Sequence, residues 1–242
     1  MKFLKISIIG LGYVGLTTAA CLAKEYEVTC VDKDEKKLKD IQLGKTPFFE
    51  EGLRELIKIG IDMGKLEFTN DLHHAVQKSE ISIICVGTPS LEDGQIDLNQ
   101  IDQVIIEISK SLKENNDYHI IAIKSTVIPG TTINRIIPML EKNSGLKPGK
   151  QFGVCVCPEF LREGQAVKDF LDSSNTGVII GELNEQSGDK LTKIFSKYSS
   201  KLIRTNLTAA EMIKYARNAY LAKDISFANT MADICAESGI DY

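Results

Sequence analysis

The chain has 242 residues, of which 43% are hydrophobic and 26% are charged, and its formal net charge is −4. These values are typical of a globular protein long enough for one large domain or two smaller ones. A weakly acidic chain has no general electrostatic attraction for nucleic acid or for an anionic membrane, so neither is expected as a partner. Any phosphate that the protein binds must therefore be held by local contacts.

The N-terminal segment predicts a strand that leads into a helix. Residues 6–23 are largely apolar and could be mistaken for a signal peptide, with only Lys2 and Lys5 before them. Three glycines interrupt the first ten residues of this stretch, which is untypical of a signal peptide or a membrane-spanning helix. We therefore expect no targeting or transmembrane segment, and a cytoplasmic location.

Short apolar runs alternate with longer amphipathic stretches along most of the chain. Strands are predicted at residues 3–9, 28–31, 81–86, 120–123, 153–156, 178–180 and 202–203, with helices between them, such as those at residues 98–112, 131–140 and 185–198. Nearly continuous apolar strands separated by helices indicate a parallel sheet that is covered on both faces. Right-handed crossovers then predict an α/β, doubly wound, mainly parallel fold of the Rossmann type over residues 1–205.

The pattern changes after residue 205. Asn206 or Thr208 is a plausible N-cap, and no glycine or proline follows until Gly239. About 30 helical residues would span roughly 45 Å, which is longer than a typical globular helix. We expect residues 206–242 to be the beginning of a central connecting helix that leads into a domain the chain does not include.

A glycine motif follows the first predicted strand, in the sequence Gly10-Leu11-Gly12-Tyr13-Val14-Gly15. The first glycine of such a motif allows a tight turn, the second lets a pyrophosphate approach the backbone, and the third lets the helix approach the sheet. The phosphates then meet free N–H groups and the positive end of the helix dipole. This arrangement predicts a dinucleotide-binding site.

Asp32 ends the second predicted strand, 22 residues after Gly10. A carboxylate there can accept hydrogen bonds from both hydroxyls of an adenine ribose and would repel the 2′-phosphate of NADP, so NAD is favoured. Two alternatives stay open: a glycine-rich turn that binds no nucleotide, and a methyltransferase, which can use a similar turn and acid. A short-chain dehydrogenase is excluded, because no tyrosine has a lysine four residues later.

The six cysteines are scattered, mostly within apolar runs, and no Cys-x-x-Cys pair occurs. Cys155 and Cys157 would share one face of a strand, but a zinc site needs about four ligands and the histidines are far away in sequence. We therefore predict buried thiols, no metal site and a reducing compartment.

Three further motifs follow predicted strands: Val86-Gly87-Thr88-Pro89, Lys124-Ser125-Thr126-Val127-Ile128-Pro129-Gly130-Thr131 and Pro158-Glu159-Phe160-Leu161-Arg162-Glu163-Gly164. An open α/β sheet binds its ligands at the carboxyl ends of its strands, where all three motifs would lie. Together with the glycine motif, they closely resemble the UDP-glucose/GDP-mannose dehydrogenase family. The resemblance runs from Lys5 to the end of the chain.

This resemblance implies a nucleotide-sugar 6-dehydrogenase of polysaccharide biosynthesis. Such enzymes oxidise the C6 alcohol of the sugar to a carboxylate in two steps and reduce two NAD. A cysteine thiolate captures the aldehyde, and the second hydride transfer leaves a thioester that water hydrolyses. The motifs are divided between two substrates: residues 218–222 resemble the UDP-glucose enzymes, whereas residues 125–131 and 181–186 resemble the GDP-mannose enzymes. UDP-glucose is favoured because its branch of the family is broader, and GDP-mannose stays open.

The resemblance also implies which residues form the site. The expected NAD contacts are Gly10, Gly12, Tyr13, Val14, Gly15, Asp32, Lys37, Thr88, Thr126 and Glu163. The expected substrate contacts are Glu159, Phe160, Leu161, Arg162, Glu163, Lys214, Asn218 and Asn229. Thr126 and Glu159 would hold the hydrolytic water and relay protons. Lys214 would stabilise the oxyanion at C6, and Asn218 would hydrogen-bond to substrate or water.

Two of these assignments have a plainer interpretation. Lys214 and Asn218 are four residues apart and share one helix face, but such pairs usually form a solvated polar face. Glu159 and Glu163 would likewise be neighbours on a helical turn. Paired carboxylates can split their pKa values for acid–base work, although most such pairs are only polar surface. The motifs around these residues favour the functional interpretation.

The family's nucleophilic cysteine lies in a Gly-Phe-Gly-Gly-x-Cys-x-Pro-Lys-Asp segment, and no such segment occurs in this sequence. We therefore expect a truncated form that binds NAD but does not turn over nucleotide sugar. A non-catalytic NAD-binding module is the alternative. The resemblance also implies a homodimer, formed in the full-length protein through the long helix and the domain after it.

Overall fold

The computed structural model describes residues 4–115, 117–172 and 177–241. Within these ranges, one eight-stranded sheet has the order β3-β2-β1-β4-β5-β6-β7-β8. The strands are β1 (Lys5–Ile9), β2 (Glu27–Val31), β3 (Leu66–Thr69), β4 (Ile81–Ile84), β5 (His119–Ile123), β6 (Phe152–Val156), β7 (Val178–Glu182) and β8 (Leu202–Asn206). Neighbouring strands are parallel except β6 and β7, which are antiparallel. The predicted doubly wound, mainly parallel α/β fold is confirmed.

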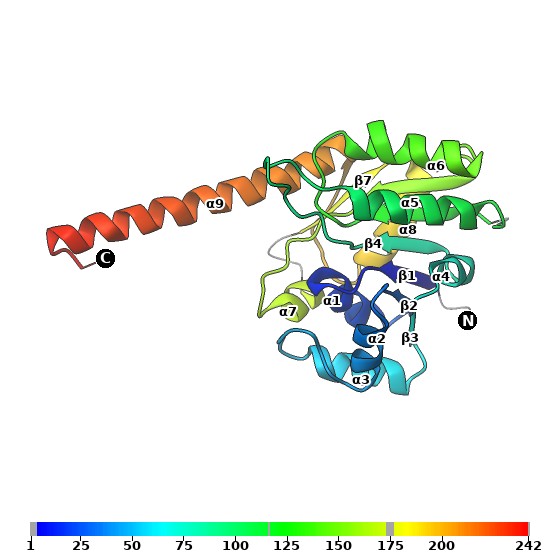
Figure 1. Ribbon diagram of the computed structural model, residues 1–242, viewed down its shortest axis with the longest axis horizontal. Helices are drawn as coiled ribbons and strands as arrows, with labels where there is room; N and C mark the ends of the chain where they lie inside the picture. The colour runs from blue at the N-terminus through cyan, green and yellow to red at the C-terminus, as the bar shows by residue number, and fades with distance from the viewer. Residues whose placement is uncertain (1–3, 116, 173–176, 242) are drawn as a thin grey trace.

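Helices cover both faces of this sheet (Figure 1). One hydrophobic cluster lies under α1 (Tyr13–Leu22), α2 (Glu35–Gln42), α3 (Leu53–Asp62), α7 (Ala166–Leu171) and α8 (Glu185–Phe195). The other lies under α4 (Leu72–Lys78), α5 (Asn99–Leu112), the π-helix η1 (Thr132–Ile136), α6 (Ile137–Ser144) and the start of α9 (Leu207–Ser238). The sheet therefore has a separate core on each face.

Strand β5 shows why the central strands read as continuous apolar runs. Ile120 and Ala122 belong to the cluster under α1, whereas Ile121 and Ile123 belong to the cluster under α5. Successive side chains of a strand point to opposite faces, and here each face is buried by helices. Both sets must therefore be apolar.

Two differences from the predicted elements have a clear physical cause. The helix expected at residues 131–140 is the π-helix η1 followed directly by α6. Pro138 near the start of α6 has no N–H, so the continuous helix lacks one hydrogen bond there. Strand β3 was not predicted, because Glu67 interrupts its four residues and Thr69 is only half-buried at the edge of the sheet. Such short edge strands carry a weak hydrophobic pattern.

The order of the strands creates a crevice between β1 and β4. The chain runs from β1 outward to β2 and β3 and then returns to place β4 on the other side of β1. The connections that leave the carboxyl ends of β1 and β4 therefore diverge to opposite faces of the sheet. Open α/β sheets bind ligands at such a switch point.

Helix α9 is 32 residues long and begins at a side-chain cap. The Asn206 side chain accepts a hydrogen bond from the backbone nitrogen of Ala209 at 2.8 Å, so Asn206 rather than Thr208 is the N-cap. Only residues near the start of α9, between Leu207 and Lys214, are buried, and the rest projects away from the sheet (Figure 1). No helix among the described residues combines the length and the apolar character needed to cross a membrane.

Candidate active site

The glycine turn between β1 and α1 opens the site. Gly10 has a φ of 92°, in the left-handed region that favours glycine, and a Cβ there would lie 2.9 Å from the backbone nitrogen of Val86. A Cβ at Gly15 would clash with the carbonyl oxygen of Gly10. A Cβ at Gly12 would meet no described atom within 4 Å. The backbone at Gly12 therefore borders open space, as a phosphate-binding turn requires.

The first turn of α1 supplies unused hydrogen-bond donors to this space. Gly12 is the N-cap of α1, and no side chain of the described residues caps the helix. The backbone N–H groups at the start of a helix have no partner within the helix and carry partial positive charge. They are suited to bind a pyrophosphate.

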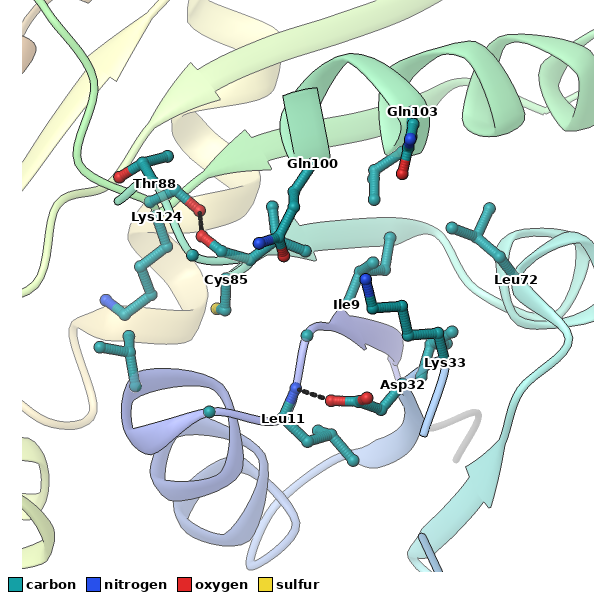
Figure 2. A pocket seen from close by; sticks show the side chains of 18 of the residues that line it. Ile9, Leu11, Asp32, Lys33, Leu72, Cys85, Thr88, Gln100, Gln103 and Lys124 are labelled. Atoms are coloured by element: carbon teal, nitrogen blue, oxygen red, sulfur yellow. Dashed lines mark hydrogen bonds between the residues drawn. The ribbon is translucent and has the colours of Figure 1, made fainter. Parts of the chain in front are cut away.

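Asp32 lies at the end of β2, beside the same turn. Its Oδ2 accepts hydrogen bonds from the backbone nitrogen of Leu11 at 2.9 Å and from Nζ of Lys37 at 2.8 Å, and its Oδ1 accepts one from Asp34 at 3.0 Å. Burial raises the pKa of Asp32, but Lys37 and the two backbone donors outweigh it, so this pKa lies below its ordinary value. The carboxylate is therefore ionised and held in place (Figure 2).

A cavity of about 490 Å³ extends from Asp32 across the glycine turn to the ends of β4 and β5. The residues expected to contact NAD that line it are Gly10, Gly12, Tyr13, Val14, Asp32, Lys37, Thr88 and Thr126. Gly15 and Glu163 do not line it: Gly15 packs behind the turn, and Glu163 is exposed in the loop after β6. Of the expected substrate contacts, only Glu159 lines this cavity.

The loops that follow β4 and β5 are joined to each other at the far end of the cavity. The hydroxyl of Thr88 donates to the backbone oxygen of Thr126 at 2.8 Å, and the hydroxyl of Ser125 donates to the backbone oxygen of Val86 at 2.6 Å. These two hydrogen bonds connect the loops and position Thr126 relative to the end of β4.

Lys214 of α9 pairs with Glu159, which lines this end of the cavity. Its Nζ lies 2.6 Å from Oε1 of Glu159, whose Oε2 accepts from the backbone nitrogen of Leu161 at 2.7 Å. Lys214 is only 7% exposed, and its ammonium lies 5.5 Å from the centre of the Phe160 ring. The interpretation of Lys214 as part of a solvated polar face is therefore wrong. Asn218 and Asn229, further along α9, are exposed and lie outside the cavity.

The residues after Glu159 are engaged mainly in structural contacts. Phe160 and Leu161 border a second, smaller cavity, and Arg162 pairs with Asp169 at 2.7 Å. The Tyr13 hydroxyl lies 2.7 Å from Oε2 of Glu50 and 2.8 Å from the backbone oxygen of Arg162. Burial and the Glu50 carboxylate raise the pKa of Tyr13, so this hydroxyl is a neutral donor that joins the loop to the start of α1.

Sequence reasoning gave no role to several residues that line the large cavity, among them Lys33, Asn70, Cys85, Gln100, Gln103 and Lys124. The glutamines come from α5, which carries no recognisable motif. Lys124 directly precedes the Ser125-Thr126 pair at the end of a strand, and that position is a signal that could have identified it.

The cysteines are free thiols, of which all but Cys235 are buried. Burial raises the pKa of Cys85 to about 12, although the ammonium of Lys124 opposes this. A nucleophilic cysteine needs a lowered pKa, so Cys85 is unsuited to that role even though it lines the cavity. The described part of the chain contains no group of three or more His, Cys, Asp and Glu residues that could hold a metal ion.

Comparison with known proteins identifies the family. Residues 4–199 match the NAD binding domain of the UDP-glucose/GDP-mannose dehydrogenase family, and residues 208–242 match the central domain of that family. The chain belongs to the UDP-glucose/GDP-mannose dehydrogenase family. Its N-terminal part is the NAD-binding domain of this family, and the glycine turn, the open space at Gly12 and the Asp32 carboxylate fit that cofactor.

Relatives within the family include enzymes for two different sugars. A GDP-mannose 6-dehydrogenase from Pseudomonas syringae pv. tomato is 43% identical over 98% of this chain and 54% of its own length. UDP-glucose 6-dehydrogenases from Haloferax volcanii and Bacillus subtilis are 36% and 37% identical over 98% of this chain, which covers 56% and 50% of them. The chain therefore spans about half the length of the curated relatives it matches.

Solved structures of the family have the same fold as this chain. The ternary complex of GDP-mannose dehydrogenase from Pseudomonas aeruginosa has a TM-score of 0.94 and 42% identity over 98% of this chain and 54% of that one. UDP-glucose dehydrogenase from Pyrobaculum islandicum has a TM-score of 0.92 and 30% identity over 99% of this chain and 55% of that one. The fold alone therefore does not separate the two substrates.

Proposed function

We propose that this chain is the NAD-binding part of a nucleotide-sugar 6-dehydrogenase that oxidises the C6 alcohol of GDP-mannose to the carboxylate. The substrate follows from sequence identity, which is 41–44% to GDP-mannose 6-dehydrogenases and 36–37% to UDP-glucose 6-dehydrogenases. The motifs are divided between the two branches, and the breadth of the UDP-glucose branch favours that substrate; the sequence identity supports the GDP-mannose alternative instead.

The pairing of Lys214 with Glu159 is the observation that carries the proposal. The buried ammonium of Lys214 lies 2.6 Å from the partly buried carboxylate of Glu159, and Glu159 lines the cavity suited to NAD. Removing two charged groups from water costs free energy unless the groups pair with each other or bind a ligand. Lys214 would stabilise negative charge that develops on the C6 oxygen of the sugar, because a fixed cation acts strongly in a site that excludes water.

The remaining site residues would have supporting roles. The hydrogen bond between Thr88 and Thr126 holds the loops after β4 and β5 together. Thr126 and Glu159 both line the cavity, where they would hold a water molecule, and Glu159 would accept or return its proton. Asn218 lies one helical turn after Lys214 on α9 and would hydrogen-bond to substrate. When bound, NAD would supply the hydride acceptor.

UDP-glucose is the second candidate substrate. Residues 218–222 resemble the UDP-glucose branch, and the relatives from Haloferax volcanii and Bacillus subtilis are named UDP-glucose 6-dehydrogenases. A non-catalytic NAD-binding module is a third candidate, since none of the six cysteines has the sequence context that the resemblance implies for the nucleophile.

Several properties of the whole protein belong to the same proposal. We place the NAD-binding domain at residues 1–205 and the start of the central helix at residues 206–242, in line with the residue ranges of the two family matches. A homodimer through α9 would cover its exposed apolar side chains, such as Tyr220, Ile225 and Phe227. The free thiols support a cytoplasmic location.

Binding and turnover assays test the proposal. GDP-mannose and UDP-glucose are titrated separately, by calorimetry, into the 242-residue chain saturated with NAD. We expect tighter binding of GDP-mannose, a large loss in Lys214→Met, and no steady formation of NADH by this polypeptide alone. Tighter binding of UDP-glucose would favour the second candidate, and binding of NAD without either sugar would favour the third.

A further inference from the structure

Lys124 is a buried cation whose function the family motifs leave unassigned. It directly follows β5 and is 5% exposed. It lines the large cavity together with Asp32 and Thr126, and it also borders the smaller cavity beside Glu159. Figure 2 shows it on the side of the glycine turn away from Asp32, with Cys85 nearby.

The ammonium of Lys124 has little compensation from the protein. It donates one long hydrogen bond, 3.4 Å, to the backbone oxygen of Cys157, and it lies 5.5 Å from the centre of the Phe195 ring. No carboxylate of residues 4–115, 117–172 or 177–241 lies within 4.0 Å of it. An ammonium has three donors, and burying them unmet is costly.

The neighbouring charges do not neutralise Lys124. Glu159 borders the same two cavities, but its Oε1 is already paired with Lys214 at 2.6 Å. Asp169 borders the smaller cavity and is paired with Arg162. Glu159 is therefore already engaged by Lys214, and the positive charge of Lys124 at this end of the large cavity is not neutralised by a carboxylate of the described residues.

The strand order decides which half of the cofactor would meet this charge. Asp32, which suits the adenine ribose, follows β2 on one side of the β1–β4 junction, and Lys124 follows β5 on the other. A dinucleotide lies across this junction. The nicotinamide half therefore belongs on the side of Lys124. Its ring carries a positive charge in NAD⁺ and none in NADH.

We propose that Lys124 disfavours NAD⁺ relative to NADH in this crevice and so makes bound NAD⁺ a stronger hydride acceptor. This rests on NAD binding at the glycine turn. A fixed cation repels the oxidised ring and leaves the reduced ring nearly unaffected, and low-dielectric surroundings strengthen the repulsion. By thermodynamic linkage, the ratio of the dissociation constants of NAD⁺ and NADH reports how strongly bound NAD⁺ accepts a hydride, and it can be measured without any turnover.

The test compares dissociation constants of NAD⁺, NADH and ADP-ribose, measured by calorimetry on the 242-residue chain. In Lys124→Met and Lys124→Gln, we expect the affinity for NAD⁺ relative to that for NADH to be about tenfold higher than in the parent. Removal of one nearby charge can change an affinity by this amount. ADP-ribose, which lacks the nicotinamide ring, should bind these variants as it binds the parent. Lys33→Met is the matched control, because Lys33 lines the crevice beside Asp32 and should not alter the ratio.

Four results would overturn the inference or its basis. Equal changes for NAD⁺ and NADH, or loss of ADP-ribose binding in both Lys124 variants, would make Lys124 a structural residue only. An equal shift of the ratio in Lys33→Met would make the effect one of general charge. Failure of all three ligands to bind the parent chain would instead refute cofactor binding itself.

Discussion

At the scale of single residues, His119 is held neutral inside the sheet. Its Nδ1 lies 3.1 Å from the backbone oxygen of Ser79, which can only accept, so Nδ1 carries the proton and Nε2 accepts from the Ser82 hydroxyl at 2.8 Å. Ser7 continues the network at 2.7 Å from Ser82. Burial is the main cause that lowers the pKa of His119 to about 4.

This network predicts a loss of stability in mild acid. Between about pH 6.5 and pH 4 the unfolded chain binds a proton at His119 that the folded protein does not, so stability falls as the pH falls through this window. The full effect is about 3 kcal/mol. In urea unfolding followed by circular dichroism, the stability advantage of the parent over His119→Gln should shrink between pH 6.5 and pH 5.

A second histidine provides the control for this measurement. His74→Gln removes an exposed imidazole on α4 and controls for the loss of a histidine as such. A difference between parent and His119→Gln that stays constant across the window would show that His119 does not titrate as proposed.

At the scale of elements, one buried carboxylate joins α9 to the loop after β5. Glu211 is 1% exposed, and its two oxygens accept from the backbone nitrogens of Gly130 at 2.6 Å and Thr132 at 2.8 Å. The negative charge lies at the start of η1, where helix N–H groups are unpaired. The same helix and the same loop carry Lys214 and Thr126, so Glu211 sets their relative position.

We expect Glu211→Gln to lower the free energy of unfolding by about 2 kcal/mol, because the amide can accept only one of the two bonds and sets an N–H₂ group against the other donor. Chemical denaturation measures this loss. Glu237→Gln makes the same change at an exposed position on the same helix and should be nearly neutral. Equal effects of the two substitutions would contradict the anchoring role of Glu211.

At the scale of the whole molecule, NAD binding should stabilise the fold. A ligand that binds only the folded state at a hundred times its dissociation constant adds about 2.7 kcal/mol. The thermal midpoint should therefore rise with NAD, rise less with NADP, whose 2′-phosphate would approach the Asp32 carboxylate, and stay unchanged in Asp32→Ala. Asp62→Ala, at an exposed position ending α3, should keep the response of the parent. An identical response in both variants would remove Asp32 from the cofactor site.

Sequence patterns alone determined the doubly wound fold, the glycine turn and the acid beside it. These features depend on short-range rules: runs of apolar residues for buried strands, glycine where the backbone turns or packs closely, and chemistry at strand ends. Gly10, Gly12 and Asp32 therefore occupy the places that the motif implies. The substrate lies beyond such rules, since residues 218–222 and 125–131 resemble different branches of the family.

Only the tertiary structure decided which charged side chains meet. Lys214 and Glu159 are 55 residues apart in sequence, and helix periodicity gave Lys214 no partner outside its own helix. The burial of Lys124 without a carboxylate partner among the described residues, and the neutral state of His119, also follow from packing by several elements at once. Electrostatic energies depend on distance and on exclusion of water, and both are properties of the packed molecule that no local pattern contains.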